Sequence, residues 1–186
     1  MARFTKLAKI AAEEAVRQSG IDFSTENTER CGTLISSGIG GLDVIEAEEQ
    51  KGLEKGFDRV SPFFIPMCIS NMAAGETAIK YGLRGLCSCT VTACAGGTNA
   101  VGDGFRNIRD GYQDVMICGG CEACITPLAI GGFTSMRALC ESEDANRASI
   151  PFDLERSGFV LGEGAGILLM EEYEHARARG AEILFE

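Results

Sequence analysis

"LCSCTVTACAGGTNAVGDGFRNIRDGYQDVMICGG" (residues 86–120) is the stretch that decides the fold of this chain. Residues 86–93 favour a strand, residues 95–109 favour a helix rich in small side chains, and residues 114–120 are a continuous apolar run typical of a strand. An apolar strand without alternation is typical of a position buried on both faces of a sheet. The three segments therefore predict a strand–helix–strand unit of an α/β fold.

The remaining segments continue this alternation of helices and strands. Residues 3–19 carry apolar side chains on one helical face, and residues 66–82 begin with Pro and end with Gly, as helices often do. A mixed or parallel sheet between helices is therefore expected, without an internal linker or repeat. Further elements are expected at 31–38 (strand), 42–50 (short helix), 127–139 (helix) and 164–186 (strand, helix, strand).

The composition indicates a folded protein and excludes several classes. The 186 residues are 45% hydrophobic, and the net charge of −10 argues against broad binding of nucleic acid or anionic membranes, because the field repels phosphates. No apolar run reaches the ~18–20 residues that span a bilayer. The N-terminal residues are amphipathic and partly acidic, unlike a secretory signal. We therefore expect a cytoplasmic protein.

The chain contains nine cysteines, an odd number, between Cys31 and Cys140. Their spacing is not that of a secreted disulfide framework, so most are expected to be reduced, buried, small side chains. Cys118, Cys121 and Cys124 follow a C-x2-C-x2-C spacing, which leaves an iron–sulfur or zinc site open as an alternative. Four thiolates are the usual requirement and no C-x3-C-P continuation follows, so we expect no metal.

Cys94 lies where the strand of residues 86–93 meets the helix of residues 95–109. The first amides of a helix lack intrahelical partners and carry partial positive charge. They can stabilise a thiolate, and they can also bind an oxyanion that forms on an attacked carbonyl. Cys94 is therefore a candidate nucleophile, although a buried cysteine at a strand end is the commoner arrangement.

Four segments occur in the order and spacing of one known family. They are "ISSGIGGLDVIE" (35–46), "VSPFFIPMCISNMAAGETAIKYGLRG" (60–85), "TACAGGTNAVGDGFRNIRDGYQDVMICGGCEACITPLAIGGFTSMRAL" (92–139) and "PFDLERSGFVLGEGAGILLMEEYEHARARGA" (151–181). With these segments the chain resembles the β-ketoacyl-acyl carrier protein synthases, and most closely the elongating type II enzymes of this thiolase-like superfamily.

The resemblance implies a thiolase-like α/β fold, a mixed sheet packed between helices. Residues 1–186 would form a single partial domain, with the first thiolase-like half at about 1–170 and the connection to the second at 171–186. It also implies the acyltransferase activity of a 3-oxoacyl-(acyl carrier protein) synthase of fatty acid biosynthesis. In that family the cysteine matching Cys94 takes the acyl group as a thioester, and its amide forms half of the oxyanion hole. Malonyl-carrier protein then loses CO2, and its enolate attacks the thioester in a decarboxylative Claisen condensation.

The resemblance further assigns pocket and partner residues. Ile39 and Phe133 match residues of the fatty-acyl pocket, whereas Arg59 and Arg137 match basic positions that face the acidic carrier protein. A local basic patch would let an acidic enzyme dock an acidic carrier. No cofactor is implied, because phosphopantetheine arrives on the carrier protein, and the family forms homodimers.

Some positions depart from the family or lack its catalytic partners. His175 is the single histidine and matches an exposed helical residue without a catalytic role. The family's two catalytic histidines and nearby lysine follow the matched region, so these residues alone are expected to be an incomplete piece that does not condense. Gly96, Asn99 and Ile150 stand where Ser or Thr, His and Arg are usual. A polyketide synthase condensing domain stays open as an alternative, whereas the cysteine argues against a chain-length-factor subunit.

Overall fold

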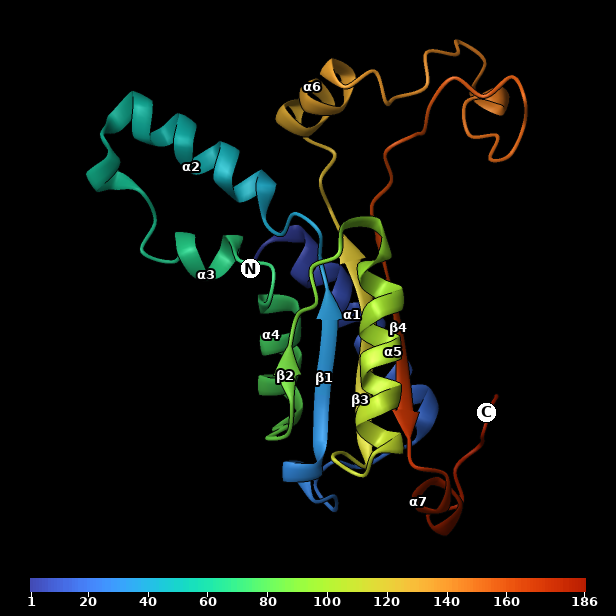
Figure 1. Cartoon of the computed structure of the whole chain (residues 1–186). Helices are drawn as coiled ribbons and strands as arrows, with labels where there is room; N and C mark the ends of the chain where they lie inside the picture. The colour runs from blue at the N-terminus through green and yellow to red at the C-terminus, as the bar shows by residue number, and fades with distance from the viewer.

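The computed structural model describes residues 1–186, and its centre is a four-stranded mixed sheet (Figure 1). The strand order is β2-β1-β3-β4, in which β2, β1 and β3 run parallel and β4 runs antiparallel to β3. The mixed sheet between helices confirms the predicted fold class. The strands span Cys31–Ser36 (β1), Cys87–Ser88 (β2), Val115–Glu122 (β3) and Gly164–Glu171 (β4).

Helices cover both faces of this sheet. The helices α1 and α4 pack on one face, and α5 packs on the other face against β1 and β3. Beyond the ends of the parallel strands lie α2, α3 and α6, whereas α7 follows β4 at the opposite end (Figure 1). The helices span Arg3–Ser19 (α1), Leu42–Lys55 (α2), Phe64–Cys68 (α3), Met72–Tyr81 (α4), Gly96–Arg109 (α5), Pro127–Ser135 (α6) and Tyr173–Ala178 (α7). Short 3-10 turns span Thr28–Arg30 (η1), Phe57–Arg59 (η2), Ala93–Ala95 (η3) and Ala145–Arg147 (η4).

The central strand β3 supplies side chains to the cores on both faces. Ile117 packs toward α1 and α4 with Ala12 and Ala78. Its neighbour Met116 packs toward α5 with Ala100, because successive side chains of a strand point to opposite faces. The continuous apolar run that predicted a strand buried on both faces is therefore confirmed.

The helix α5 lies unusually close to the sheet because small residues face each other. A Cβ atom built on Gly120 of β3 would lie 3.0 Å from the Cα of Gly97. A Cβ built on Gly104 would collide with the sulfur of Cys118 and lie 2.7 Å from the Cε of Met170. Gly97 and Gly104 thus allow close packing of α5 against the sheet, near its start and in its second half.

The segment 66–82 forms two helices rather than the single helix expected from its ends. The helix α3 ends at Cys68, Ile69 is extended, and α4 begins at Met72. The carbonyl of Cys68 accepts the amide of Gly41 at 3.0 Å. A helix that continued would need this carbonyl for the amide of Met72, so the contact with Gly41 accompanies the break.

Three further expectations need correction. Only Cys87–Ser88 of the strand predicted at 86–93 is paired, because the Thr90 carbonyl accepts the Ser36 hydroxyl and side-chain contacts replace the strand ladder. The helix α6 ends at Ser135 rather than at 139. Residues 181–186 form no strand, since no strand of the sheet pairs with them.

Among the helices, none combines the length and the apolar character needed to cross a membrane.

Candidate active site

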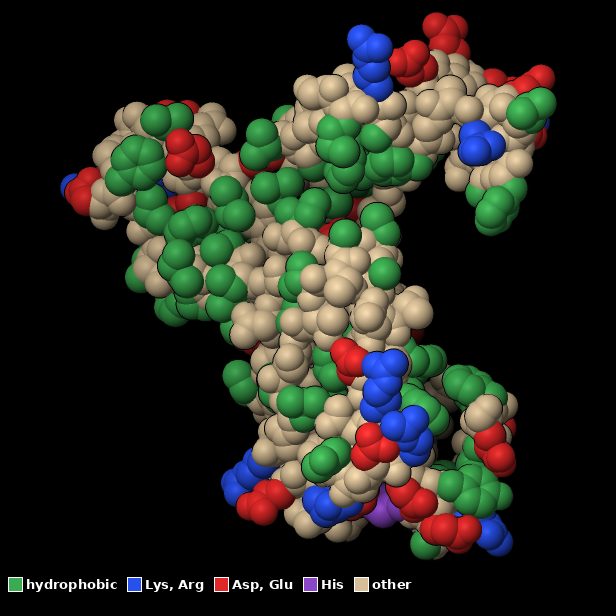
Figure 2. All heavy atoms as spheres, viewed as in Figure 1, with side chains coloured by type: hydrophobic (Ala, Val, Ile, Leu, Met, Phe, Trp, Pro, Cys, Tyr) green, Lys and Arg blue, Asp and Glu red, His purple; other side chains and the backbone are tan.

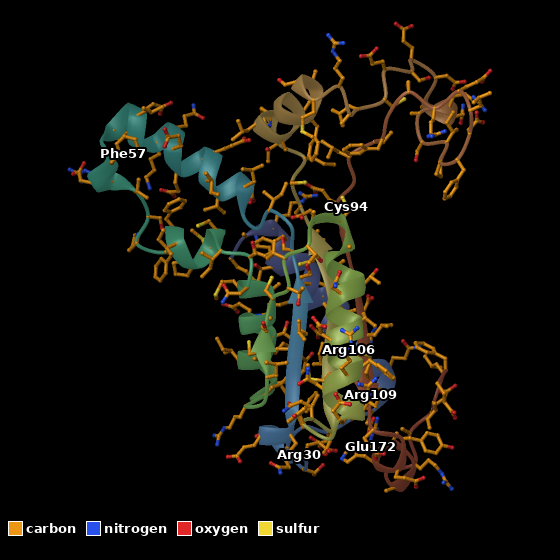
Figure 3. The ribbon with its side chains drawn as sticks, viewed as in Figure 1. Arg30, Phe57, Cys94, Arg106, Arg109 and Glu172 are labelled. Atoms are coloured by element: carbon orange, nitrogen blue, oxygen red, sulfur yellow. The ribbon has the colours of Figure 1, made fainter.

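Cys94 lies in η3, directly before α5, with its side chain exposed (Figure 3). It stands at the end of the sheet where β1, β2 and β3 finish, which we call the carboxyl edge; the opposite end is the amino edge. The preceding residue, Ala93, has a φ of 49°, a left-handed conformation that non-glycine residues seldom adopt. The amide of Cys94 donates to no acceptor of the chain backbone. This position therefore presents a thiol and a free N–H group side by side, as the sequence predicted for a nucleophile.

The turn after β1 lies beside this cysteine. We call residues 37–41 the β1 turn. A Cβ atom built on Gly38 would lie 3.9 Å from the Cα and the carbonyl oxygen of Ala93. Because β1 and β2 are parallel, the segments that follow them emerge at the same edge of the sheet, where ligand sites of α/β proteins usually lie.

An open apolar groove of about 190 Å³ lies at the carboxyl edge between the start of α2 and α6. Ile39 and Phe133, the two residues predicted to line an acyl pocket, are both in its wall. The ring of Phe133 packs edge-on against Phe159 at a centroid distance of 5.2 Å. Residues from the β1 turn and from α6 thus meet in one groove, which is lined by Ile39, Leu42, Leu128, Ala129, Gly132, Phe133 and Met136.

Glu122, the last residue of β3, is a residue of this edge that the sequence reasoning missed. Its carboxylate accepts the Ser37 hydroxyl at 3.0 Å and the amides of Gly38 and Ile39 at 2.8 and 3.2 Å. The sequence signal that could have found it is a single acidic residue at the end of a strand that is otherwise small and apolar. In "CGGCEAC" its cysteine neighbours have the more conspicuous pattern, a spacing typical of metal ligands.

The two predicted carrier-binding arginines are both exposed, but they lie apart. Arg137 adjoins the groove through its neighbour Met136, whereas Arg59 lies in η2, beyond the far end of α2 (Figure 1). The side chain of Arg59 is 71% exposed and pairs with Asp58 at 3.4 Å. Within this chain the two arginines therefore do not form one basic patch.

The three cysteines at C-x2-C-x2-C spacing are not arranged as metal ligands. Cys118 packs with Ala100 on the α5 side of β3, and Cys121 packs with Phe4 on the α1 side. Burial raises the pKa of each of these thiols to about 12, so both are protonated at neutral pH. Two ligands on opposite faces of a sheet cannot hold one metal centre, and no group of three or more His, Cys, Asp or Glu side chains is placed to do so. The alternative of an iron–sulfur or zinc site at Cys118, Cys121 and Cys124 is therefore wrong.

His175 lies in α7 at the amino edge, at the other end of the sheet from Cys94. Its Nδ1 lies 2.6 Å from Oε1 of Glu171, and its Nε2 lies 3.0 Å from Oε2 of Glu26. Burial lowers the pKa of this imidazole, but the hydrogen bonds and charges of the two carboxylates outweigh it and raise the pKa above its ordinary value of 6.5. The predicted helix is present, but the predicted exposed side chain is wrong, because Glu26 reaches the ring from 149 residues away in the chain.

Two departures from the resembled family have local partners. Gly96 is buried, and a Cβ atom at this position would collide with the side chain of Ser36. A serine at position 36 therefore occupies the space that a larger residue 96 would need. The Thr92 hydroxyl donates to Oδ1 of Asn99 at 3.0 Å, which ties the segment before Cys94 to the first turns of α5.

Comparison of the sequence with known proteins gives strong matches over nearly its whole length. A family model described as "Beta-ketoacyl synthase, N-terminal domain" matches residues 1–176. The 3-oxoacyl-(acyl-carrier-protein) synthase 2 of Synechocystis is 51% identical over 187 residues, covering 100% of this chain and 45% of that protein. The synthase 2 of Staphylococcus aureus is 48% identical over 186 residues, covering 100% of this chain and 46% of that protein. The chain thus spans a little less than half the length of these relatives.

Solved structures give the same result at lower identity. A ketosynthase of a type II polyketide synthase, solved in complex with its acyl-carrier protein, has a TM-score of 0.91 and 36% identity, covering 97% of this chain and 46% of that chain. A β-ketoacyl synthase from Burkholderia phymatum has a TM-score of 0.85 and 32% identity, covering 98% of this chain and 45% of that chain. These structures confirm the fold class predicted from the sequence.

Proposed function

The chain belongs to the β-ketoacyl synthase family, and on that premise we propose that it supplies the nucleophile of a 3-oxoacyl-(acyl carrier protein) synthase of fatty acid biosynthesis. The observation that carries the proposal is the exposed Cys94 in η3, directly before α5, at the same edge of the sheet as an apolar groove. The relatives named as 3-oxoacyl-(acyl-carrier-protein) synthase 2, which are 51% and 48% identical, support it. The phosphopantetheine of the carrier substrate is the only prosthetic group that the proposed reaction uses.

The first proposed step is acyl transfer to Cys94. The sulfur of Cys94, as thiolate, attacks the carbonyl carbon of an acyl thioester, and a tetrahedral oxyanion forms. The Cys94 amide, which has no backbone acceptor, is placed to donate to that oxyanion. The intermediate collapses with loss of the phosphopantetheine thiolate, which takes up a proton, and the acyl group remains on Cys94 as a thioester.

The second proposed step is condensation with malonyl-carrier protein. Loss of CO2 from the malonyl group leaves an enolate, whose carbon attacks the Cys94 thioester and expels the cysteine thiolate. The product is a 3-oxoacyl thioester with two more carbons. The only histidine of this chain is held at the amino edge by two carboxylates. We therefore propose that groups outside these 186 residues stabilise the enolate.

The carrier protein would dock on exposed arginines at the carboxyl edge. Arg137 adjoins the groove, and a positive charge there attracts an acidic partner. Arg137→Glu in the full-length protein is expected to raise KM for acyl-carrier protein while leaving KM for acyl-pantetheine unchanged. Arg177→Glu, an equally exposed change on α7, serves as the control and should alter neither value. Equal effects of Arg137→Glu on both substrates would contradict carrier docking at Arg137.

A homodimer forms the second part of the proposal. The strand β2 is at the edge of the sheet with one side unpaired, and a second copy could continue the sheet there. Sedimentation of the full-length protein tests this state, and a monomer at micromolar concentration would contradict it.

A polyketide ketosynthase is the second candidate function. The observation that favours it is the TM-score of 0.91 with a ketosynthase of a type II polyketide synthase. The product distinguishes the two candidates. Repeated condensation without reduction of the 3-oxo group indicates a polyketide enzyme, whereas one extension of saturated acyl groups indicates fatty acid synthesis.

Peptide mapping after incubation with acyl-carrier protein tests the proposed nucleophile. We expect the full-length protein to gain one acyl group, located on the peptide that contains Cys94. Cys68→Ala provides a control, because Cys68 is also a free, partly exposed thiol and lies outside β2, so its loss should leave labelling unchanged. Acylation at another cysteine, or no acylation by any acyl-carrier protein from C4 to C16, would refute the proposal.

A further inference from the structure

The carboxylate of Glu122 is held without a cation. No Lys, Arg or His forms a salt bridge with it, and its three partners are the Ser37 hydroxyl and the amides of Gly38 and Ile39. Hydrogen bonds to a carboxylate are shorter and stronger than those between neutral groups. The carboxylate therefore holds the β1 turn through these hydrogen bonds and takes part in no salt bridge.

The hydrogen bonds of this carboxylate extend through the whole β1 turn. Ser37, which donates to Glu122, also accepts the amide of Gly40 at 2.9 Å through the same hydroxyl. Gly38 leaves room for the carboxylate, since a Cβ atom there would lie 3.0 Å from Oε2 of Glu122. Four consecutive residues, 37–40, are thus positioned directly or indirectly by one side chain.

The position of the turn decides the shape of the groove. Ile39 lines the groove opposite side chains from α6 such as Phe133, and its own amide is one of the groups that Glu122 holds. Without the carboxylate, the amides of Gly38 and Ile39 lose their acceptor, and the turn gains other conformations in which water satisfies these amides. A shift of about 1 Å in a positioning element can change a rate substantially.

We propose that Glu122 is a positioning residue that sets the acyl-chain selectivity of the groove by holding the β1 turn and Ile39. The inference rests on the proposed function, in which the groove receives the acyl group delivered to Cys94. Glu122 does not touch the reacting atoms in this proposal. Its effect is on which acyl groups fit, and the reactivity of the thiol itself is left unchanged.

The experiment measures acylation of Cys94 by C4 and by C12 acyl-pantetheine in the full-length protein, using intact mass. Glu122→Ala is expected to change the ratio of the C12 to the C4 rate by at least about threefold, since a displaced pocket wall changes discrimination by a modest factor. Alkylation of Cys94 by iodoacetamide should stay within about twofold of the wild-type rate, which shows that the thiol is intact. Glu122→Gln keeps an oxygen acceptor for the two amides and is expected to restore most of the wild-type ratio.

Two further variants complete the design. Glu48→Gln is the matched control, because Glu48 also accepts a backbone amide, that of Ser61 at 2.8 Å, but does so away from the groove. It should leave the ratio unchanged. If Glu122→Ala does not fold, Ser37→Ala decides, because it removes the donor to Glu122 and the acceptor of Gly40, and it should shift the ratio in the same direction.

The outcomes separate this inference from the proposed function. A wild-type protein that accepts no acyl group at Cys94 refutes the proposed function. An acylated wild type with an unchanged ratio in Glu122→Ala, or in Ser37→Ala where that variant decides, refutes the role of Glu122 alone. A Glu122→Ala variant that slows alkylation and both acylations equally also refutes it, because the effect would then lie on the thiol or on the whole fold.

Discussion

The two edges of the sheet differ in how they satisfy charge. At the amino edge, Glu171 accepts hydrogen bonds from Nε and Nη2 of Arg179, each at 2.7 Å, and His175 bridges Glu171 and Glu26. At the carboxyl edge, the carboxylate of Glu122 has only amides and a hydroxyl as partners. Figure 3 shows the separation, with Arg30 and Glu172 near the lower end of the sheet and Cys94 at its upper end.

The difference indicates that ion pairs stabilise the amino edge, whereas the proposed active site lies at the carboxyl edge. Paired charges at the amino edge tie α7 and the segment before β1 to the sheet. The free Cys94 amide and the apolar groove at the carboxyl edge suit the proposed reaction, in which an uncharged thioester becomes negative only in the intermediate. Figure 2 shows apolar side chains gathered over α2 and α3, and both signs of charge at the lower end as well as over the loop that follows α6.

Replacing Cys94 should have the largest effect and should separate the two edges most clearly. In the full-length protein, Cys94→Ala is expected to lower condensation by a factor of at least about 10³, because no other group can carry the acyl intermediate. The melting temperature should move by less than about 2 °C, since the side chain is exposed. A large loss of stability would mean that Cys94 belongs to the packed structure, and the comparison of edges would fail.

Removing Glu171 should produce the opposite result at the amino edge. Glu171→Ala is expected to cost about 3 kcal/mol of unfolding free energy, because it leaves Arg179 and His175 without their shared carboxylate, whose side chain is only 7% exposed. Urea denaturation measures the loss, and acylation per folded molecule should stay at the wild-type level. Glu174→Ala, in an exposed pair with Arg177, is the control and should leave the denaturation midpoint unchanged.

A compensating pair of substitutions sharpens the view of how the carboxyl edge is packed. Gly96→Ser is expected to cost about 2 kcal/mol, because the new Cβ atom collides with Ser36. Adding Ser36→Gly removes the obstructing side chain and should restore more than half of that loss in a double-mutant cycle. Additive effects of the two substitutions would show that the collision is relieved elsewhere.

The smallest expected effect is the pH dependence of the amino edge. The folded-state pKa of His175 is raised, so its contribution to stability is fully present below pH 6.5 and is lost as the pH rises through the folded pKa. The groups that face it are Glu171 and Glu26, and Arg179 shares Glu171. Between pH 6 and pH 8 the wild type should lose up to about 1 kcal/mol relative to His175→Gln, measured by urea denaturation. Parallel pH profiles of the two proteins would contradict this assignment.

The sequence predicted elements whose information is local. The apolar run of β3, the helix at 3–19 and the start of a helix after Cys94 are where expected. The elements that the sequence predicted wrongly depend on contacts between residues far apart in the chain. The amide of Gly41 takes the Cys68 carbonyl and accompanies the break between α3 and α4.

The residues of the candidate site also fall into those that the sequence predicted and those that it did not. Resemblance identified Ile39 and Phe133, and the structure brings both into one groove. Glu122 escaped notice because its partners lie 83 to 85 residues earlier in the chain, where no local pattern marks them as donors. The spacing of Cys118 and Cys121, which left a metal site open as an alternative, does not bring the two thiols together, because in a strand an odd separation sends two side chains to opposite faces.

The burial of the other cysteines has a consequence for how the protein meets electrophiles. Burial raises the pKa of Cys31 to about 11 and those of Cys118 and Cys121 to about 12, so these three sulfurs stay protonated and shielded. Burial also raises the pKa of Cys87, Cys89 and Cys124. Of the nine thiols, these six therefore have a reduced thiolate fraction at neutral pH and react slowly with an oxidant or alkylating agent. Burial thus lowers the reactivity of most thiols in this protein. A reagent can therefore modify it at few cysteines although it contains many.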